Sequence, residues 1–146
     1  MSTDATVTGM VEAALYVRDL DRSVAFYEDL FGFATEIRDE QICVLNVASQ
    51  SALILLPVWV KDLPDRLGTD DVPFVGNIPS SGAEGRGHVA LKIPKSELPK
   101  WEGRLAGKNI EIVGRTKWPR GGESIYFRDP DEHLVELLTP GLWSFY

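Results

Sequence analysis

The two halves of this 146-residue chain repeat the same short motifs in the same order. The stretch Glu12–Val17, EAALYV, corresponds to His88–Ile93, HVALKI. Ala52–Pro57, ALILLP, corresponds to Leu134–Pro140, LVELLTP, with one residue added. Self-similarity of this kind indicates that each half is one supersecondary unit that is buried against the other. The repeat therefore constrains the fold to two equivalent modules.

Hydrophobic periodicity predicts the same element order in both halves: a strand, a helix, then three strands. Asp19 suits the N-cap of the first helix, and Gly32 stands where a left-handed C-terminal residue is needed. The second helix is expected to begin at Lys95 or Ser96 and to end at Gly107. The sequence thus predicts an α+β fold of two βαβββ modules. The predicted strands are Val11–Val17, Phe33–Ile37, Ile42–Val47 and Ala52–Leu56 in the first module, and His88–Ile93, Ile110–Val113, Ser124–Phe127 and His133–Leu138 in the second.

The length of the chain fits a single domain over residues 1–146. We place the first module at about 10–57 and the second at about 87–140. The connection between them, about 58–86, is rich in Pro and Gly. Because loops this long in compact domains are usually functional or disordered, we interpret it as a lid or pocket wall rather than an idle connector.

Composition and charge argue against some classes of partner. A formal charge of -7 does not suit a nucleic-acid surface, which needs clustered Lys and Arg. No apolar run approaches the roughly 20 residues of a membrane-spanning helix. The N-terminus lacks the basic start and apolar core of a signal peptide. The single cysteine, Cys43, excludes an internal disulfide, and its apolar neighbours indicate a small buried hydrophobe. A cytoplasmic protein is therefore expected, without nucleic-acid or membrane partners.

Three polar residues stand on strands that are otherwise mostly apolar. Between Leu134 and Leu138 the one polar side chain is Glu136, which is expected to be buried, where an unpaired charge is costly. Glu12 and His88 occupy equivalent positions in the two modules, so the pseudo-twofold should bring both to one end of a shared sheet interior. Together the three suit one divalent metal ion, because the metal offsets the desolvation of the carboxylates.

Three protein ligands would leave positions open for water or substrate, which is the pattern of catalytic sites. One imidazole and two carboxylates suit Fe, Mn, Ni, Zn or Co, and the sequence does not select among these metals. The alternative is structural: Glu12 at the rim of the sheet, Glu136 paired with an arginine, and His88 a hydrogen-bonded core histidine.

Two hydroxyls are candidates for contacts in the same site. Ser124 and Tyr126 alternate with apolar residues, so both should lie on one face, beside the strand that carries Glu136. Ser124 is a candidate substrate contact. Tyr126 is a candidate catalytic proton donor or substrate clamp, because a phenol is an acid at neutral pH. A core tyrosine with a hydrogen-bonded hydroxyl is the alternative.

Further candidates lie in loops. Arg120, between Pro119 and Gly121, is a candidate for binding an anionic substrate, with a solvated loop arginine as the alternative. Trp59 and Trp118 are candidate walls of an aromatic substrate pocket, with simple packing as the alternative. His133 lies next to Asp131 and Glu132 and is expected to be exposed rather than catalytic.

Several stretches resemble the vicinal-oxygen-chelate superfamily, which contains glyoxalases, bleomycin resistance proteins and dioxygenases. They are Ala14–Tyr27 with Gly32 and Phe33, Gly87–Leu91, Ser124–Asp131 and Leu134–Leu138. The resemblance covers roughly residues 10–140. It implies that the two βαβββ modules form a U-shaped half-barrel of mixed sheet around a metal. It also implies ligands on the first strand of each module and on the last strand, at the positions of Glu12, His88 and Glu136.

The chain departs from parts of this family pattern. Many members have His or Gln where Glu12 stands. The fourth ligand position of glyoxalase I enzymes falls near Ile54, which offers no ligand, so that reaction is placed in doubt. Thiol-transferring fosfomycin resistance enzymes share the three-ligand pattern, but they surround the phosphonate with a lysine, serine and arginine set. The matching loop here is TKWPRGG, Thr116–Gly122, and this activity is not carried over.

Two functions remain. The first is a divalent-metal-dependent enzyme, a glyoxalase-like lyase or isomerase or an extradiol-type dioxygenase, that binds a small substrate through two oxygens. Either ligating glutamate, Glu12 or Glu136, is then a candidate general base. The alternative is a metal-free binding protein of the bleomycin-resistance type that sequesters a cationic small molecule. A homodimer is expected in both cases, and Glu12 then joins His88 and Glu136 of its own chain or of a partner.

Overall fold

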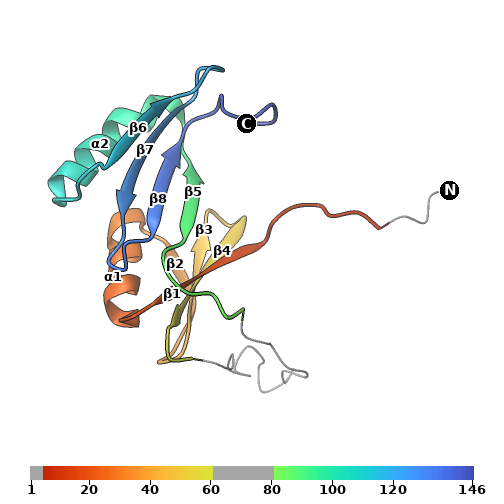
Figure 1. Cartoon of the computed structure of the whole chain (residues 1–146), viewed down its shortest axis with the longest axis vertical. Helices are drawn as coiled ribbons and strands as arrows, with labels where there is room; N and C mark the ends of the chain where they lie inside the picture. Colours follow the sequence, from red (N-terminus) through yellow and green to blue (C-terminus); the bar gives the residue numbers. More distant parts are fainter. Residues whose placement is uncertain (1–4, 61–80) are drawn as a thin grey trace.

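The computed structural model describes residues 5–60 and 81–146, where two βαβββ modules follow each other along the chain (Figure 1). The doubled module and the α+β class predicted from the sequence are confirmed. Residues 61–80 of the predicted lid lie outside the described residues. The first module contains β1 (Glu12–Val17), α1 (Leu20–Phe31), β2 (Ala34–Arg38), β3 (Cys43–Val47) and β4 (Ser51–Pro57). The second contains β5 (His88–Lys92), the 3-10 turn η1 (Lys95–Glu97), α2 (Leu98–Gly107), β6 (Gly114–Lys117), β7 (Glu123–Arg128) and β8 (Leu134–Leu138).

Each module forms its own four-stranded mixed sheet. The strand orders are β1-β4-β3-β2 and β5-β8-β7-β6, so the two sheets have the same topology. In each sheet the first and last strands of the module run parallel, and the other neighbours run antiparallel. β1 and β5 are therefore edge strands, each hydrogen-bonded to one neighbour within its own sheet.

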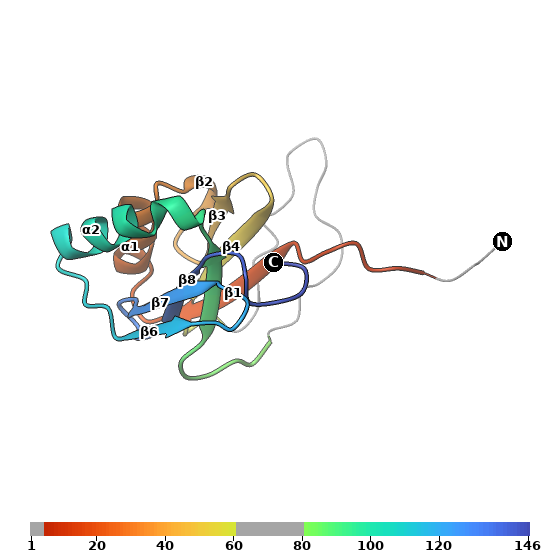
Figure 2. The ribbon, with the colours of Figure 1, turned by 90° about the horizontal axis from the view of Figure 1, so that it is seen from above.

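Both helices lie on the same side of the molecule (Figures 1 and 2). The core between them and the sheets is apolar and aromatic: Phe31 contacts Trp101 and Phe127 of the other module, with ring centroids 5.5 and 6.3 Å apart. Cys43 is fully buried, and burial raises the pKa of its thiol to about 11. Among the described residues, no helix is long and apolar enough to cross a membrane. Because the helices cover one face of the sheets, the opposite faces are left open.

The first helix is capped as its sequence predicts. Asp19 accepts a hydrogen bond from the Arg22 backbone amide, and Gly32 closes the helix with a left-handed φ of 70°. The sixth strand, by contrast, was predicted at Ile110–Val113 and lies at Gly114–Lys117. The alternating apolar residues Ile110 and Ile112 pack against the core, whereas hydrogen bonding to β7 uses the polar residues that follow.

The expectation that His133 is exposed is wrong, since only 2% of this residue is accessible. Its Nδ1 accepts a hydrogen bond from the Gly87 amide, and its Nε2 donates to the Tyr16 carbonyl, both at 2.7 Å. A backbone amide only donates and a carbonyl only accepts, so the imidazole proton lies on Nε2. The charged neighbours of His133 suggested a surface turn, but the imidazole joins β1 to the residue preceding β5.

The same turn binds the first helix through two buried carboxylates. The Oδ1 atom of Asp131 accepts hydrogen bonds from the Arg18 amide and guanidinium at 2.9 and 3.0 Å, and its Oδ2 accepts one from the Ser23 hydroxyl at 3.1 Å. Asp129 accepts a 2.8 Å hydrogen bond from Tyr27. Burial alone would raise the pKa of Asp131, but the bonds from Arg18 and Ser23 outweigh burial and hold it below its ordinary value of 3.8.

Replacing this carboxylate tests its contribution to the contact between the modules. Asp131→Asn is expected to lower the free energy of unfolding at pH 7 by about 1.5–3 kcal/mol, the range for hydrogen bonds to a charged group. A lowered folded pKa stabilises the protein above the unfolded pKa, and this stabilisation is lost as the pH falls through the folded pKa. The difference in free energy of unfolding between variant and wild type, measured with urea, should therefore become smaller below pH 3.8.

The control for this experiment is Asp21→Asn, because the Asp21 side chain is 91% exposed although it also pairs with an arginine, Arg38. Its effect on stability should be within a few tenths of a kcal/mol. A stability difference for Asp131→Asn that does not change with pH would contradict the assignment.

Candidate functional site

The polar side chains of the second sheet gather on its open face. Register pairs Glu136 of β8 with Ala90 of β5 on one side and with Tyr126 of β7 on the other, so the side chains at these positions share a face. Ser124, two residues before Tyr126, lies on the same face. The alternate residues of these strands form the core against the helices; they are Val89, Leu91, Ile125, Phe127, Val135 and Leu137. The period-two alternation in the sequence is what places the polar set here.

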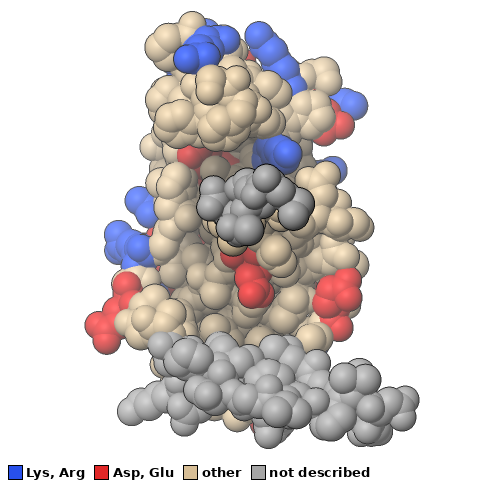
Figure 3. Space-filling view, turned by 90° about the vertical axis from the view of Figure 1, so that its right-hand side faces the viewer, with Lys and Arg blue, Asp and Glu red and all other residues tan. Residues whose placement is uncertain are grey.

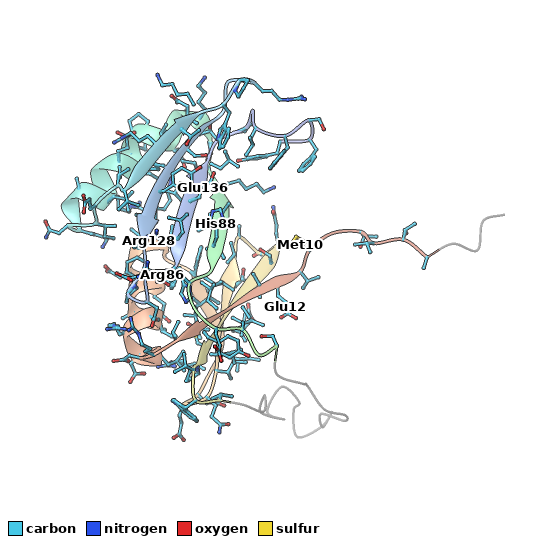
Figure 4. All side chains as sticks on the ribbon, viewed as in Figure 1. Met10, Glu12, Arg86, His88, Arg128 and Glu136 are labelled. Atoms are coloured by element: carbon cyan, nitrogen blue, oxygen red, sulfur yellow. The ribbon has the colours of Figure 1, made fainter. Side chains whose placement is uncertain are left out.

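His88 and Glu136 form the centre of this face. The His88 Nε2 and Glu136 Oε1 atoms are 3.0 Å apart, and Figure 4 shows the two side chains together. Glu136 is 5% exposed, as the sequence predicts, whereas the His88 side chain is 51% exposed. A buried carboxylate is thus covered by an imidazole that solvent can reach.

Ser124 and Trp118 lie behind Glu136. The Ser124 hydroxyl donates a 2.6 Å hydrogen bond to Glu136 Oε2, and the Trp118 indole N–H donates a 2.8 Å bond to the Ser124 oxygen. Ser124 is 1% exposed, so its hydroxyl faces the carboxylate in the interior. The structure therefore brings both residues to the site: Ser124 binds Glu136 directly, and Trp118 binds Ser124.

Tyr126 lies beside Glu136 on the neighbouring strand and is half-buried. Its ring lies over Gly114, where an added Cβ would come within 3.4 Å of a ring carbon. In residues 5–60 and 81–146 its hydroxyl has no hydrogen-bond partner. The hydroxyl is accordingly available to a bound molecule.

Glu12 is not part of this cluster within one chain. It is exposed on β1 and lines, with His88, Met10 and Leu53, a groove of about 300 Å³. Figure 4 shows it apart from His88 and Glu136. No three His, Cys, Asp or Glu side chains of the described chain lie close enough together to hold a metal. The expected convergence of all three residues is absent from the single chain, because β1 and β5 belong to separate sheets and do not pair.

The two other loop candidates, Arg120 and Trp59, lie in separate parts of the molecule. Arg120 is exposed in the turn that joins β6 to β7, where the Gly121 amide donates to the Trp118 carbonyl at 2.9 Å. Trp59 is 57% exposed and lines a different depression, beside Arg18 and Arg38 near the start of α1. A single chain therefore does not bring Trp59 to His88.

Sequence reasoning missed Lys92 and the C-terminal segment. Lys92 follows His88 and Ala90 on the exposed face of β5, and its Nζ lies 5.6 Å from the centre of the Tyr146 ring. The alternation along β5 was the available signal. The Tyr146 hydroxyl donates to the Leu138 carbonyl at 2.8 Å, which holds the chain end beside the site. Figure 3, seen from the side away from the helices, shows Lys and Arg at the top and several acidic side chains lower on this face.

Comparison with known proteins identifies the family of this chain. The family model described as the Glyoxalase/Bleomycin resistance protein/Dioxygenase superfamily matches residues 9–137. Metallothiol transferase FosB of Lysinibacillus sphaericus is 29% identical over 135 residues, covering 92% of this chain and 84% of that protein. Fosfomycin resistance protein FosX of Listeria innocua is 24% identical over 132 residues, covering 90% of this chain and 89% of FosX.

A solved structure described as lactoylglutathione lyase from Agrobacterium tumefaciens aligns with a TM-score of 0.81 and 29% identity. The alignment covers 97% of this chain and 100% of the other. The resemblance noted in the sequence is confirmed, and the chain belongs to the Glyoxalase/Bleomycin resistance protein/Dioxygenase superfamily.

Proposed function

We propose that this protein is a divalent-metal-dependent enzyme that binds a small substrate through two of its oxygen atoms. The carrying observation is the 3.0 Å separation of His88 Nε2 and Glu136 Oε1. Two ligands at bonds of about 2.1 Å that meet at a right angle are about 3.0 Å apart. The pair is therefore spaced like adjacent ligands of one metal ion, and the names of the metallothiol transferase relatives support the same reading.

In this proposal the third ligand is Glu12 of a second copy of the chain, in a homodimer. The Glu12 carboxylate is exposed and has no hydrogen-bond partner among the described residues. The chain before β1 extends away from the modules toward the N-terminus (Figure 1), and Val7, Met10 and Val11 are 92%, 87% and 71% exposed. Apolar side chains this accessible, beside a strand with one edge unpaired in its own sheet, favour association with another chain.

The bound metal would act as a Lewis acid that polarises the substrate oxygens and stabilises developing negative charge. On the chain itself, Tyr126 supplies a free hydroxyl beside Glu136 to hold or protonate a substrate oxygen. Arg120, exposed in the turn between β6 and β7, is the candidate for binding an anionic group of the substrate. The names of the FosB and lactoylglutathione lyase relatives favour transferase or lyase chemistry over ring cleavage by dioxygen.

Metal content tests this proposal. Protein purified without chelator or added metal is expected to carry close to one Fe, Mn, Ni, Zn or Co ion per site, measured by elemental analysis. The double variant His88→Ala, Glu136→Ala should lose the metal, because two adjacent ligands are gone. Glu111→Ala, which removes an exposed carboxylate between α2 and β6, is the control and should keep the metal. Wild-type protein that stays empty after dialysis against Mn, Fe, Ni and Zn would refute the metalloenzyme.

Mixing two variants that each lack one metal ligand tests whether the site is shared between chains. Glu12→Ala and His88→Ala are each expected to bind little metal alone. If Glu12 comes from the partner, a heterodimer of the two has one intact site and one doubly defective site. After unfolding and refolding of an equal mixture, about a quarter of the wild-type metal content should return. A mixture as empty as its components would assign all ligands to one chain.

The alternative function is a metal-free binding protein for a cationic small molecule. It is favoured by the exposed, stacked pair Trp143 and Phe145, whose ring centroids are 6.5 Å apart, and by the net charge of -7. Fluorescence titration of metal-free protein with a cationic aromatic compound, with Trp143→Ala as comparison, distinguishes this function from the first.

A further inference from the structure

Two consecutive hydrogen bonds, from Trp118 to Ser124 and from Ser124 to Glu136, are not explained by the proposed function. An indole N–H can only donate, so the Ser124 oxygen must accept the 2.8 Å bond from Trp118. The single Ser124 proton is then directed to Glu136 Oε2 at 2.6 Å. Because the first donor is an indole N–H, both hydrogen bonds run in one direction, from Trp118 to Ser124 and from Ser124 to Glu136.

These hydrogen bonds give the two carboxylate oxygens of Glu136 different surroundings. A length of 2.6 Å lies in the range of about 2.5–2.7 Å for a hydroxyl bound to a charged carboxylate, which is among the stronger hydrogen bonds. Oε2 is thereby held in the interior. Oε1 is left facing His88, where the open face of the sheet begins.

We propose that Trp118 and Ser124 are positioning residues that hold Glu136 as a fixed ligand through Oε1 alone, so that Glu12 is the carboxylate free to exchange. This inference rests on the proposed metal site and assigns different roles to its two glutamates. Glu136 is 5% exposed and its Oε2 accepts the Ser124 hydrogen bond, whereas the Glu12 carboxylate is exposed with no hydrogen bond in the part of the chain that is described. Dissociation of Glu136 would require the Ser124 bond to break in the interior.

The backbone around Trp118 is built to keep this donor in place. The Trp118 amide donates to the Gly122 carbonyl at 2.8 Å, and the Gly122 amide donates to the Gly141 carbonyl at 3.0 Å. Gly141 has a φ of 116°, and a Cβ on it would come within 2.4 Å of the Gly122 nitrogen. The segment after β8 therefore closes against the turn, and only glycine permits this approach. A rigid second layer of this kind orients metal ligands in general.

Binding of Co²⁺ tests the positioning role without any knowledge of the substrate. Trp118→Phe keeps the ring but removes the N–H, and it is expected to weaken Co²⁺ binding by about 10–100-fold, as loss of outer hydrogen bonds to metal ligands does. The visible absorption of bound Co²⁺ should also change, because Glu136 is no longer restricted to one oxygen. Affinity is measured by competition with a chromophoric chelator. Trp143→Phe, at an exposed tryptophan, is the matched control and should leave both readouts unchanged.

Ser124→Ala removes the next member of the chain and should reproduce both effects, provided that its circular dichroism and melting temperature match the wild type. If it does not fold, Trp118→Phe decides alone. Wild-type affinity and an unchanged Co²⁺ spectrum in Trp118→Phe would overturn the positioning role while the metal site stands. Failure of wild-type protein to bind Co²⁺ would overturn the metal site and this inference with it.

Discussion

The relative position of the two modules depends on the turn between β7 and β8. Three of its side chains bind the first module: Asp129 binds Tyr27, Asp131 binds Arg18 and Ser23, and His133 binds the Tyr16 carbonyl. His133 also accepts from the amide of Gly87, which immediately precedes His88. The Leu134 amide in turn donates to the Gly87 carbonyl at 2.9 Å. The contact that joins the modules therefore also fixes the start of β5, and with it the place of His88 relative to Glu136.

The two glutamates of the proposed metal site differ in environment rather than in chemistry. Glu136 is enclosed by the sheet and hydrogen-bonded by Ser124, so moving its carboxylate would leave buried polar groups without partners, at a cost comparable to a lost hydrogen bond. Glu12 lies exposed on an edge strand, and no hydrogen bond within the described residues restrains its carboxylate. One fixed and one exchangeable carboxylate would let a substrate enter without loss of the metal.

The open faces of the two sheets have one physical origin. Each module has a single helix, which covers one face of its sheet and leaves the other bare. Pairing with a second copy would cover bare face and edge strand together, and it would bring a Glu12 from outside the chain to His88 and Glu136. The association proposed for the protein and the completion of its site are thus one event.

Repetition and alternation in the sequence predicted the two βαβββ modules and the burial of Glu136. Capping residues predicted the ends of α1, and the resemblance of several stretches to known members predicted the family. The strand faces and helix caps are local features, because they depend on neighbours within a few residues. Three others needed the tertiary structure. His133 is buried, and Ile110 and Ile112 pack against the core instead of forming a strand. Trp118 donates a hydrogen bond to Ser124, which donates one to Glu136. Each depends on partners 6 to 117 residues away in the chain, and distant partners leave no periodic trace in the sequence.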